Sequence, residues 1–228
     1  GTFDWAYEEE FHCRDGYRWS PDGRNIAYWR IDATTVRDFY MINNTDSIYS
    51  QIIPVEYPKA GEKPSEAKIG VIDASGGPTV WMRIEGDPAN NYLPRMIWHP
   101  NGKKLLMQQL NRAQNHNKIL EGTINDGNIK NIFEDKDEAW LEVVDDFNYF
   151  DRGDAFSWVS EKSGWKSLYL IQDGREKAIS PLDSDLLSIS LLDEKSDYLY
   201  YIASPDNPTQ RYLWRAPLNA KKGSPERV

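Results

Sequence analysis

Residues 4–11, Asp-Trp-Ala-Tyr-Glu-Glu-Glu-Phe, place three adjacent carboxylates directly beside aromatic side chains. Like charges this close repel one another, so such a cluster is stable only where water solvates it or a cation neutralises it. An ammonium group is a natural partner for it. The alternative is a solvated charged surface, which is the common explanation of an arbitrary run of glutamates.

The spacing of the aromatic residues favours a held cluster over a flexible acidic loop. Tyr7 and Phe11 are four residues apart, and Tyr7 and Glu10 are three apart. On a helical turn, residues three and four apart share a face. The spacing therefore predicts a short helix with a mostly aromatic packed face, from which some carboxylates project outward in fixed positions.

Composition excludes several classes of partner. Acidic residues outnumber basic ones, 36 against 27, giving a net charge of −9. We therefore expect no nucleic-acid partner, because phosphate binding needs a basic surface.

The single cysteine, Cys13, rules out an intrachain disulfide, and we expect a buried structural thiol there. No apolar run approaches the roughly 20 residues of a membrane helix, and no signal peptide is recognisable. The chain reads as a segment of a longer protein.

A loose repeat runs along the chain: an apolar strand, a turn rich in Pro, Asp or Gly, and a second apolar strand. Its copies are residues 17–28, 96–107, 150–159 and, without glycine, 191–201. This pattern is typical of β-hairpins, since Pro sets the first corner of the turn and Gly accepts positive φ at the next. A second hairpin follows the first three copies, and residues 33–66 read as a polar insertion in the first unit.

Four strands per unit, repeated every 40–50 residues or so, indicate propeller blades. We expect an all-β fold, a partial β-propeller of about four four-stranded blades; a ring can close with four blades, and six to eight are equally available. The expected blades form one propeller domain and cover approximately residues 17–85, 92–134, 143–180 and 186–218. A β-sandwich with similar hairpins is the alternative.

These motifs, taken in order, resemble the dipeptidyl peptidase IV family of prolyl oligopeptidase-like serine peptidases. The resemblance rests on residues 4–10, on Trp19-Ser20-Pro21-Asp22-Gly23, on Tyr57-Pro58-Lys59-Ala60-Gly61 and on residues 197–202. It implies an eight-bladed β-propeller, of which this chain is a part, followed by an α/β-hydrolase domain. No G-x-S-x-G nucleophile elbow occurs in the chain. We therefore expect the hydrolase domain to lie outside this chain, no catalytic residue within it, and no activity of the segment alone.

The resemblance also implies site residues. In the family's D-W-x-Y-E-E-E motif the last two glutamates, here Glu9 and Glu10, bind the free α-amine of a peptide substrate, and Glu8 is structural or solvated. An aromatic residue of a later blade lies against the substrate side chain. Aligning on Gly153 puts Tyr149 there, with Phe147 and Phe150 as neighbours that could line the site instead. Each could equally be an ordinary strand aromatic.

The expected function is thus that of a propeller segment in a serine exopeptidase releasing N-terminal dipeptides of Xaa-Pro or Xaa-Ala type. We expect peptides with a free N-terminus and the protein's own hydrolase domain as partners, a homodimer in full-length form, and a periplasmic, secreted or cell-surface location. No cofactor or metal is expected. The alternative is a non-catalytic propeller scaffold for peptide or protein binding. A Trp-Asp-type repeat propeller is disfavoured, because the Trp-Asp dipeptide does not occur.

Overall fold

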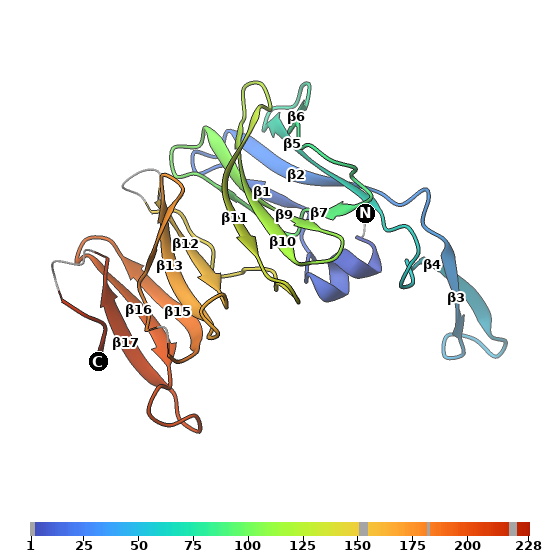
Figure 1. Cartoon of the computed structure of the whole chain (residues 1–228). Coiled ribbons are helices and arrows are strands. Elements are labelled where there is room, and N and C mark those ends of the chain that lie inside the picture. Colours follow the sequence, from blue (N-terminus) through green and yellow to red (C-terminus); the bar gives the residue numbers. More distant parts are fainter. Residues whose placement is uncertain (1–2, 151–154, 182, 219–222) are drawn as a thin grey trace. The chain divides into compact units, whose positions relative to one another are not determined.

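The computed structural model describes residues 3–150, 155–181, 183–218 and 223–228. Within them the chain forms antiparallel sheets and one short helical turn, as expected from its many aromatic residues (Figure 1). It divides into two compact units, residues 1–131 and 132–228, which are described separately.

The first sheet has the strand order β1-β2-β5-β6. Its strands are β1 (Tyr17–Trp19), β2 (Asn25–Asp32), β5 (Glu66–Asp73) and β6 (Val80–Trp81). In the turn between β1 and β2, the Asp22 carboxylate accepts hydrogen bonds from the Ser20 hydroxyl (2.7 Å) and the Arg24 amide (3.1 Å). Gly23 takes the positive φ of 69° that the turn requires. The predicted hairpin is confirmed, with Trp19 opposite Ile26.

The predicted insertion is also confirmed, because β2 pairs directly with β5 and the chain between them leaves the sheet. It forms a separate two-stranded ribbon of β3 (Asp38–Asn43) and β4 (Gln51–Glu56). We call residues 38–56 the arm. Figure 1 shows the arm at the end of the first unit, away from the β9–β10 sheet. Although the insertion reads as polar, both arm strands carry large apolar side chains that are exposed.

The second sheet has the order β11-β10-β9-β7, and β8 also pairs with β9. Its strands are β7 (Asn91–Tyr92), β8 (Met96–Trp98), β9 (Lys104–Asn111), β10 (His116–Thr123) and β11 (Ile129–Lys136). The predicted turn between β8 and β9 places Gly102 at φ 68°. The middle of β9, Leu105 to Leu110, is buried throughout, so this strand forms much of the core of the first unit.

The second unit contains two further sheets. One is β12 (Ala155–Ser160), β13 (Ser167–Gln172) and β14 (Arg175–Ala178), and the other is β15 (Leu186–Asp193), β16 (Tyr198–Ala203), β17 (Tyr212–Pro217) and β18 (Glu226–Arg227). The fourth predicted hairpin is confirmed, with Asp193 opposite Tyr198. Residues 151–154, the turn of the third repeat, lie outside the described residues. Before them, Tyr149 makes a single β-bridge to Phe156.

Successive antiparallel sheets of this kind are the blades of a partial β-propeller. No described helix is both long and apolar enough to cross a membrane. The helical turn, residues Ala6–Glu10, precedes the first sheet and carries the acidic run.

Candidate functional site

The acidic run folds into a single π-helical turn that starts after Trp5 and ends at Glu10. The Phe11 amide donates to the Ala6 carbonyl at 3.1 Å, the i to i+5 bond that defines this geometry. We call residues 4–11 the acidic turn. The predicted helical turn is therefore confirmed, although its winding is wider than that of an α-helix.

The Asp4 side chain fixes the start of the acidic turn. Its side chain is buried, and one carboxylate oxygen accepts the Tyr7 amide at 3.1 Å, as a helix-capping residue does. The other oxygen accepts the Ser65 amide at 2.9 Å. A single buried carboxylate thus joins the turn to the segment that enters β5.

Tyr7 fixes the middle of the acidic turn. Its ring is fully buried, and its hydroxyl oxygen accepts the Leu93 amide at 3.0 Å. Burial raises the pKa of the Tyr7 phenol far above its ordinary value, so the side chain stays neutral. The ring packs against Phe11 and Tyr92, with centroids 5.7 and 6.0 Å away. The predicted aromatic packing face is confirmed for Tyr7 and Phe11.

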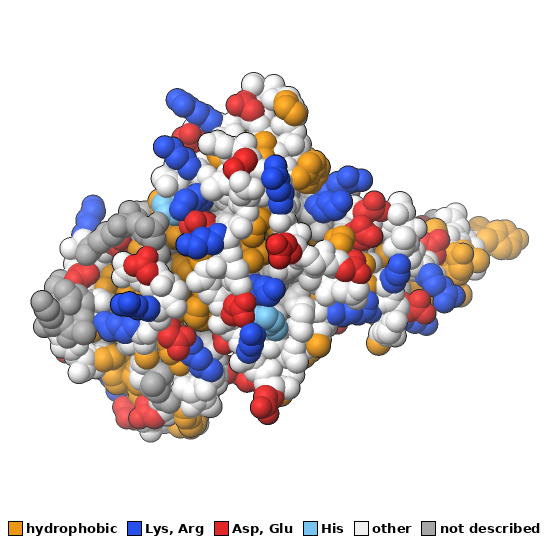
Figure 2. Space-filling view, turned by 45° about the horizontal axis from the view of Figure 1, so that its top comes forward, with side chains coloured by type: hydrophobic (Ala, Val, Ile, Leu, Met, Phe, Trp, Pro, Cys, Tyr) orange, Lys and Arg blue, Asp and Glu red, His pale blue; other side chains and the backbone are white. Residues whose placement is uncertain are grey.

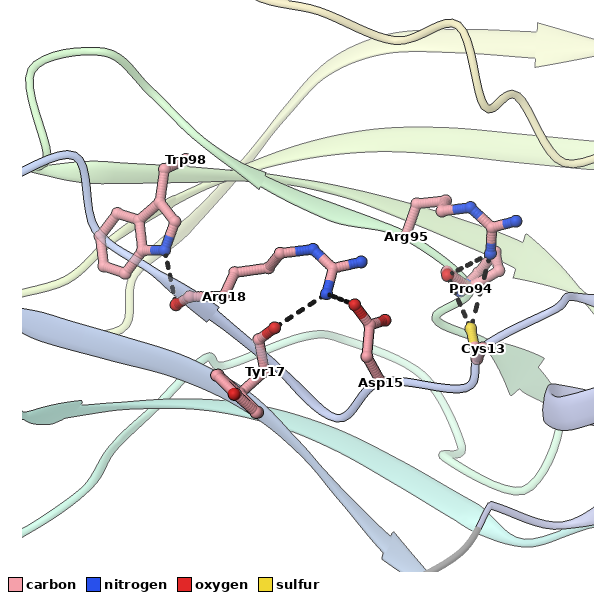
Figure 3. Close-up of polar contacts among 7 residues, drawn as sticks. All are labelled: Cys13, Asp15, Tyr17, Arg18, Pro94, Arg95 and Trp98. Carbon is pink, nitrogen blue, oxygen red and sulfur yellow. Dashed lines mark hydrogen bonds and ion pairs between the residues drawn. The ribbon is translucent and has the colours of Figure 1, made fainter.

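The chain leaving the acidic turn is tied to the segment between β7 and β8 (Figure 3). The Cys13 thiol donates to the Pro94 carbonyl at 2.9 Å, and the Arg95 guanidinium reaches the same carbonyl at 2.7 Å. Further along, the Trp98 indole donates to the Arg18 carbonyl at 3.0 Å. Cys13 is the buried structural thiol that we expected, and burial raises its pKa to about 11.

Trp5 departs from the predicted packing. Its side chain is 42% exposed, and its ring lies 4.9 Å from that of Tyr57. Tyr57 in turn contacts Phe39 at the base of the arm, with ring centroids 5.6 Å apart. Trp5 therefore joins the acidic turn to the arm instead of to the core.

The three glutamates are more exposed than Asp4 and Tyr7, the residues that anchor the turn. Glu8 is half-buried, whereas Glu9 and Glu10 are exposed. Within the described part of the chain, no hydrogen bond or ion pair engages the carboxylates of Glu9 and Glu10. Burial raises the pKa of the Tyr92 phenol, and the nearby negative charge of Glu10 raises it further.

The backbone of the acidic turn therefore presents two neighbouring, uncompensated negative charges above a packed aromatic base. Such a pair can accept charge-assisted hydrogen bonds from an ammonium group with little rearrangement of the backbone. Among the described residues no group of His, Cys, Asp and Glu side chains is placed to hold a metal ion.

Tyr149, the third predicted site residue, belongs to the second unit. It is buried and its ring lies 6.2 Å from that of Phe156. Its two neighbours Phe147 and Phe150 are also buried. The structure thus brings Glu9 and Glu10 together on one turn and places Tyr149 in the packing around β12, so a substrate contact for it stays a prediction.

Sequence reasoning missed the residues that hold the acidic turn. Asp4 stands three residues before Tyr7, the spacing of a capping side chain, so its local role could have been read from the sequence. Its second contact, at Ser65, and the Tyr7 contact at Leu93 join residues 61 and 86 positions apart. No local pattern encodes those contacts.

The family model for the dipeptidyl peptidase IV (DPP IV) N-terminal region matches residues 1–228. Dipeptidyl peptidase 4 of Trichophyton rubrum is 24% identical over 239 residues, covering 99% of this chain and 31% of that protein. The inactive dipeptidyl peptidase 10 of Mus musculus is 25% identical over 232 residues, covering 95% and 29%.

Two solved structures have a similar fold. Dipeptidyl peptidase 4 of Porphyromonas gingivalis superposes with a TM-score of 0.89 at 26% identity, over 100% of this chain and 32% of that one. A putative dipeptidyl aminopeptidase IV of Bacteroides ovatus has the same fold, with a TM-score of 0.82 at 21% identity, over 94% and 33%. The chain thus spans about a third of the length of the relatives that it matches.

Proposed function

We propose that this chain, which belongs to the dipeptidyl peptidase IV N-terminal region family, is the part of a dipeptidyl peptidase that binds the substrate's free α-amine. Glu9 and Glu10 accept hydrogen bonds from the ammonium group of a peptide. The parent protein's α/β-hydrolase domain supplies the serine nucleophile, and this chain supplies no catalytic residue.

The observation that supports the proposal is the contrast between the two glutamates and their base. The carboxylates are exposed and unpaired among the described residues, while Asp4 and Tyr7 hold the backbone beneath them through buried contacts. A purely solvated charge run needs no such base. A site that measures peptide length from the N-terminus does, because the carboxylates must stay at a fixed distance from the nucleophile.

This arrangement also accounts for exopeptidase specificity. A charge-assisted hydrogen bond is roughly twice as strong as a neutral one. An acylated N-terminus would bring no positive charge and would leave both carboxylates desolvated without a partner. We propose release of N-terminal dipeptides of Xaa-Pro or Xaa-Ala type, with the preference at the second residue set by the hydrolase pocket and Tyr149 a candidate contact.

The second candidate function is a non-catalytic propeller that binds peptides or proteins. It is favoured by one comparison, the 25% identity to a relative that is named inactive. The two functions differ in the hydrolase domain: a G-x-S-x-G elbow followed by Asp and His supports the peptidase, and loss of that serine supports the scaffold.

We further propose that the parent protein is a homodimer and that the arm takes part in the dimer. Tyr40, Ile42 and Ile52 are 65%, 66% and 70% exposed, and among the described residues the arm strands pair only with each other. An isolated two-stranded ribbon is marginally stable, and exposed apolar clusters mark interaction surfaces. Figure 2 shows hydrophobic side chains gathered at the end of the arm. The periplasmic or secreted location stays a prediction.

The test of amine binding uses the full-length protein with Glu9→Gln, Glu10→Gln and, as the matched control, Glu8→Gln. Losing one charge-assisted contact to a buried ammonium is worth about 2–4 kcal/mol, or roughly 30- to 800-fold in kcat/KM. We expect that loss for the Glu9 and Glu10 variants with a dipeptidyl substrate and a much smaller change for Glu8→Gln. Unchanged kinetics in both Glu9→Gln and Glu10→Gln would remove the proposed role.

A further inference from the structure

A polar cavity of about 200 Å³ lies in the first unit, apart from the acidic turn. It opens between the segment that leads into β7 and one face of β9 and β10. The side chains that matter for its chemistry are Glu85, Asp87, Asn91, Gln109, His116 and Lys118. Three of these come from hydrogen-bonded neighbouring strands: Asn91 from β7, Gln109 from β9 and Lys118 from β10.

The inner wall of the cavity is made of two buried amides. Asn91 and Gln109 are 9% and 8% exposed. The Asn91 amide nitrogen donates to the Asp87 carbonyl at 2.8 Å, and the Gln109 amide nitrogen donates to the Glu85 carbonyl at 2.8 Å. These bonds fix each amide with its nitrogen toward the backbone of residues 85–87.

The oxygens of the same two amides are left as acceptors. Within the described residues neither accepts a hydrogen bond, and neither is among the buried polar atoms sealed from solvent without a partner. The accessible space at their position is the cavity. Two nearly buried side chains therefore present acceptor oxygens to the solvent-accessible space of the cavity.

Residues 85–87 form the outer wall and approach the amides closely. Gly86 has φ +104°, and a Cβ there would lie 3.2 Å from the Asn91 amide nitrogen. A larger residue would be strained and would crowd the floor of the cavity. Glu85 and Asp87 are exposed, and the Asp87 carboxylate already accepts the Ala89 amide at 3.0 Å and the Asn90 side-chain amide at 2.6 Å. Lys118 supplies an ammonium from β10.

We propose that this cavity binds a neutral polyhydroxylated ligand of monosaccharide size. Ligand hydroxyls can donate to the two amide oxygens and to the carboxylates, and can accept from Lys118. A cationic ligand would face the Lys118 ammonium, and an anionic one would face Glu85 and Asp87. The volume lies below the roughly 300–1,000 Å³ of drug-sized sites, which limits the ligand to about one sugar ring. This site is independent of the proposed peptidase function.

The test is saturation-transfer difference NMR on the full-length protein with methyl α-glucoside, α-galactoside and α-mannoside. Methylguanidinium and acetate are the cationic and anionic comparison probes. We expect saturation of at least one glycoside and none of the charged probes. Failure of all three glycosides, or saturation of a charged probe alone, would overturn the proposal.

Variants localise the binding. Gln109→Met removes an inner acceptor and Lys118→Met removes the ammonium, and each is expected to weaken glycoside binding about tenfold, since each removes one hydrogen-bonding group. Lys103→Met, in the exposed turn before β9, is the matched control and is expected to leave affinity unchanged. Because Lys118 is only half-buried, its variant keeps the test valid even where Gln109→Met fails to fold. Equal affinity in Lys118→Met and the unmodified protein would contradict the proposal.

Discussion

The acidic turn and the arm are both exposed parts of the first unit, and they are exposed in opposite ways. The acidic turn presents charged side chains from a backbone that Asp4 and Tyr7 hold by buried contacts. The arm presents apolar side chains such as Ile42 from a ribbon that, within the described part of the chain, pairs with no other strand. Charge on a fixed base suits recognition of one small group, whereas apolar surface on an unsupported ribbon suits burial against another protein.

The two regions are exposed for different reasons. Glu9 and Glu10 would be solvated in any conformation, so what distinguishes the acidic turn is the buried packing of Asp4 and Tyr7 beneath it. Apolar side chains in contact with water are unfavourable in the isolated chain, so what distinguishes the arm is its exposed apolar surface. Substitutions should therefore affect folding at the base of the turn and association at the arm.

The largest expected effect on folding is that of Tyr7→Ala. Truncating a fully buried aromatic residue costs about 3–5 kcal/mol of unfolding free energy, because transfer and cavity terms add. Tyr40→Ala in the arm is the matched control and should change the unfolding free energy of the monomer by less than about 0.5 kcal/mol, so both variants are compared at protein concentrations low enough to keep them monomeric. Chemical denaturation of the full-length variants measures both. Equal losses at the two positions would break the comparison.

Asp4→Ala should come next, with a loss of about 1.5–3 kcal/mol, since two backbone amides, those of Tyr7 and Ser65, lose a charged acceptor. Asp4→Asn keeps one carbonyl oxygen and should recover part of the loss. Denaturation midpoints distinguish the two variants. No difference between Asp4→Ala and the unmodified protein would show that the carboxylate does not anchor the turn.

A smaller effect concerns pH and Cys13, just after the acidic turn. Its thiol pKa is about 11 in the folded protein and about 8.5 in an unfolded chain, so folding favours the neutral thiol. This contribution is fully present below pH 8.5 or so and is lost as pH rises toward about 11, by roughly 1–3 kcal/mol. Comparing denaturation of Cys13→Ala with the unmodified protein between pH 8 and 11 isolates it. Parallel pH profiles would contradict the prediction.

The smallest effect on folding is expected in the arm, where it should coincide with a large effect on assembly. Ile42→Asp should change the unfolding free energy of the monomer by less than about 0.5 kcal/mol and convert the proposed full-length dimer to a monomer. Sedimentation velocity measures the assembly state, and Gln51→Glu, an exposed polar position on the partner strand, is the control. A dimer that survives Ile42→Asp would exclude this face of the arm from the interface.

The repeated hairpins could be predicted from the sequence because their determinants are local. Pro, Asp and Gly occupy the turns, and Gly23 and Gly102 have the positive φ that these turns need. The acidic turn could be predicted because Tyr7 and Phe11 repeat at helical spacing. Its anchoring could not, since the amides of Ser65 and Leu93 approach it only in the folded chain.

The arm shows a different limit. Polar residues of its connecting segments dominate the composition of residues 33–66, so the sequence favoured a polar insertion. The apolar residues of β3 and β4 form two unbroken runs, residues 39–42 and 52–55, and their exposure depends on what the ribbon fails to pack against. An exposed strand of this kind can have the same residue pattern as a strand that packs against a core, so the sequence does not distinguish the two.

The stack of Phe39, Tyr57 and Trp5 sets where the arm can be excised. Phe39 lies near the start of β3, and its ring contacts that of Tyr57, which in turn contacts the ring of Trp5. Met41 and Ile53 face each other further out, so an Asn-Gly linker could close a shortened hairpin there. Such a shortened arm lacks the distal apolar surface and keeps the aromatic contacts that support the acidic turn.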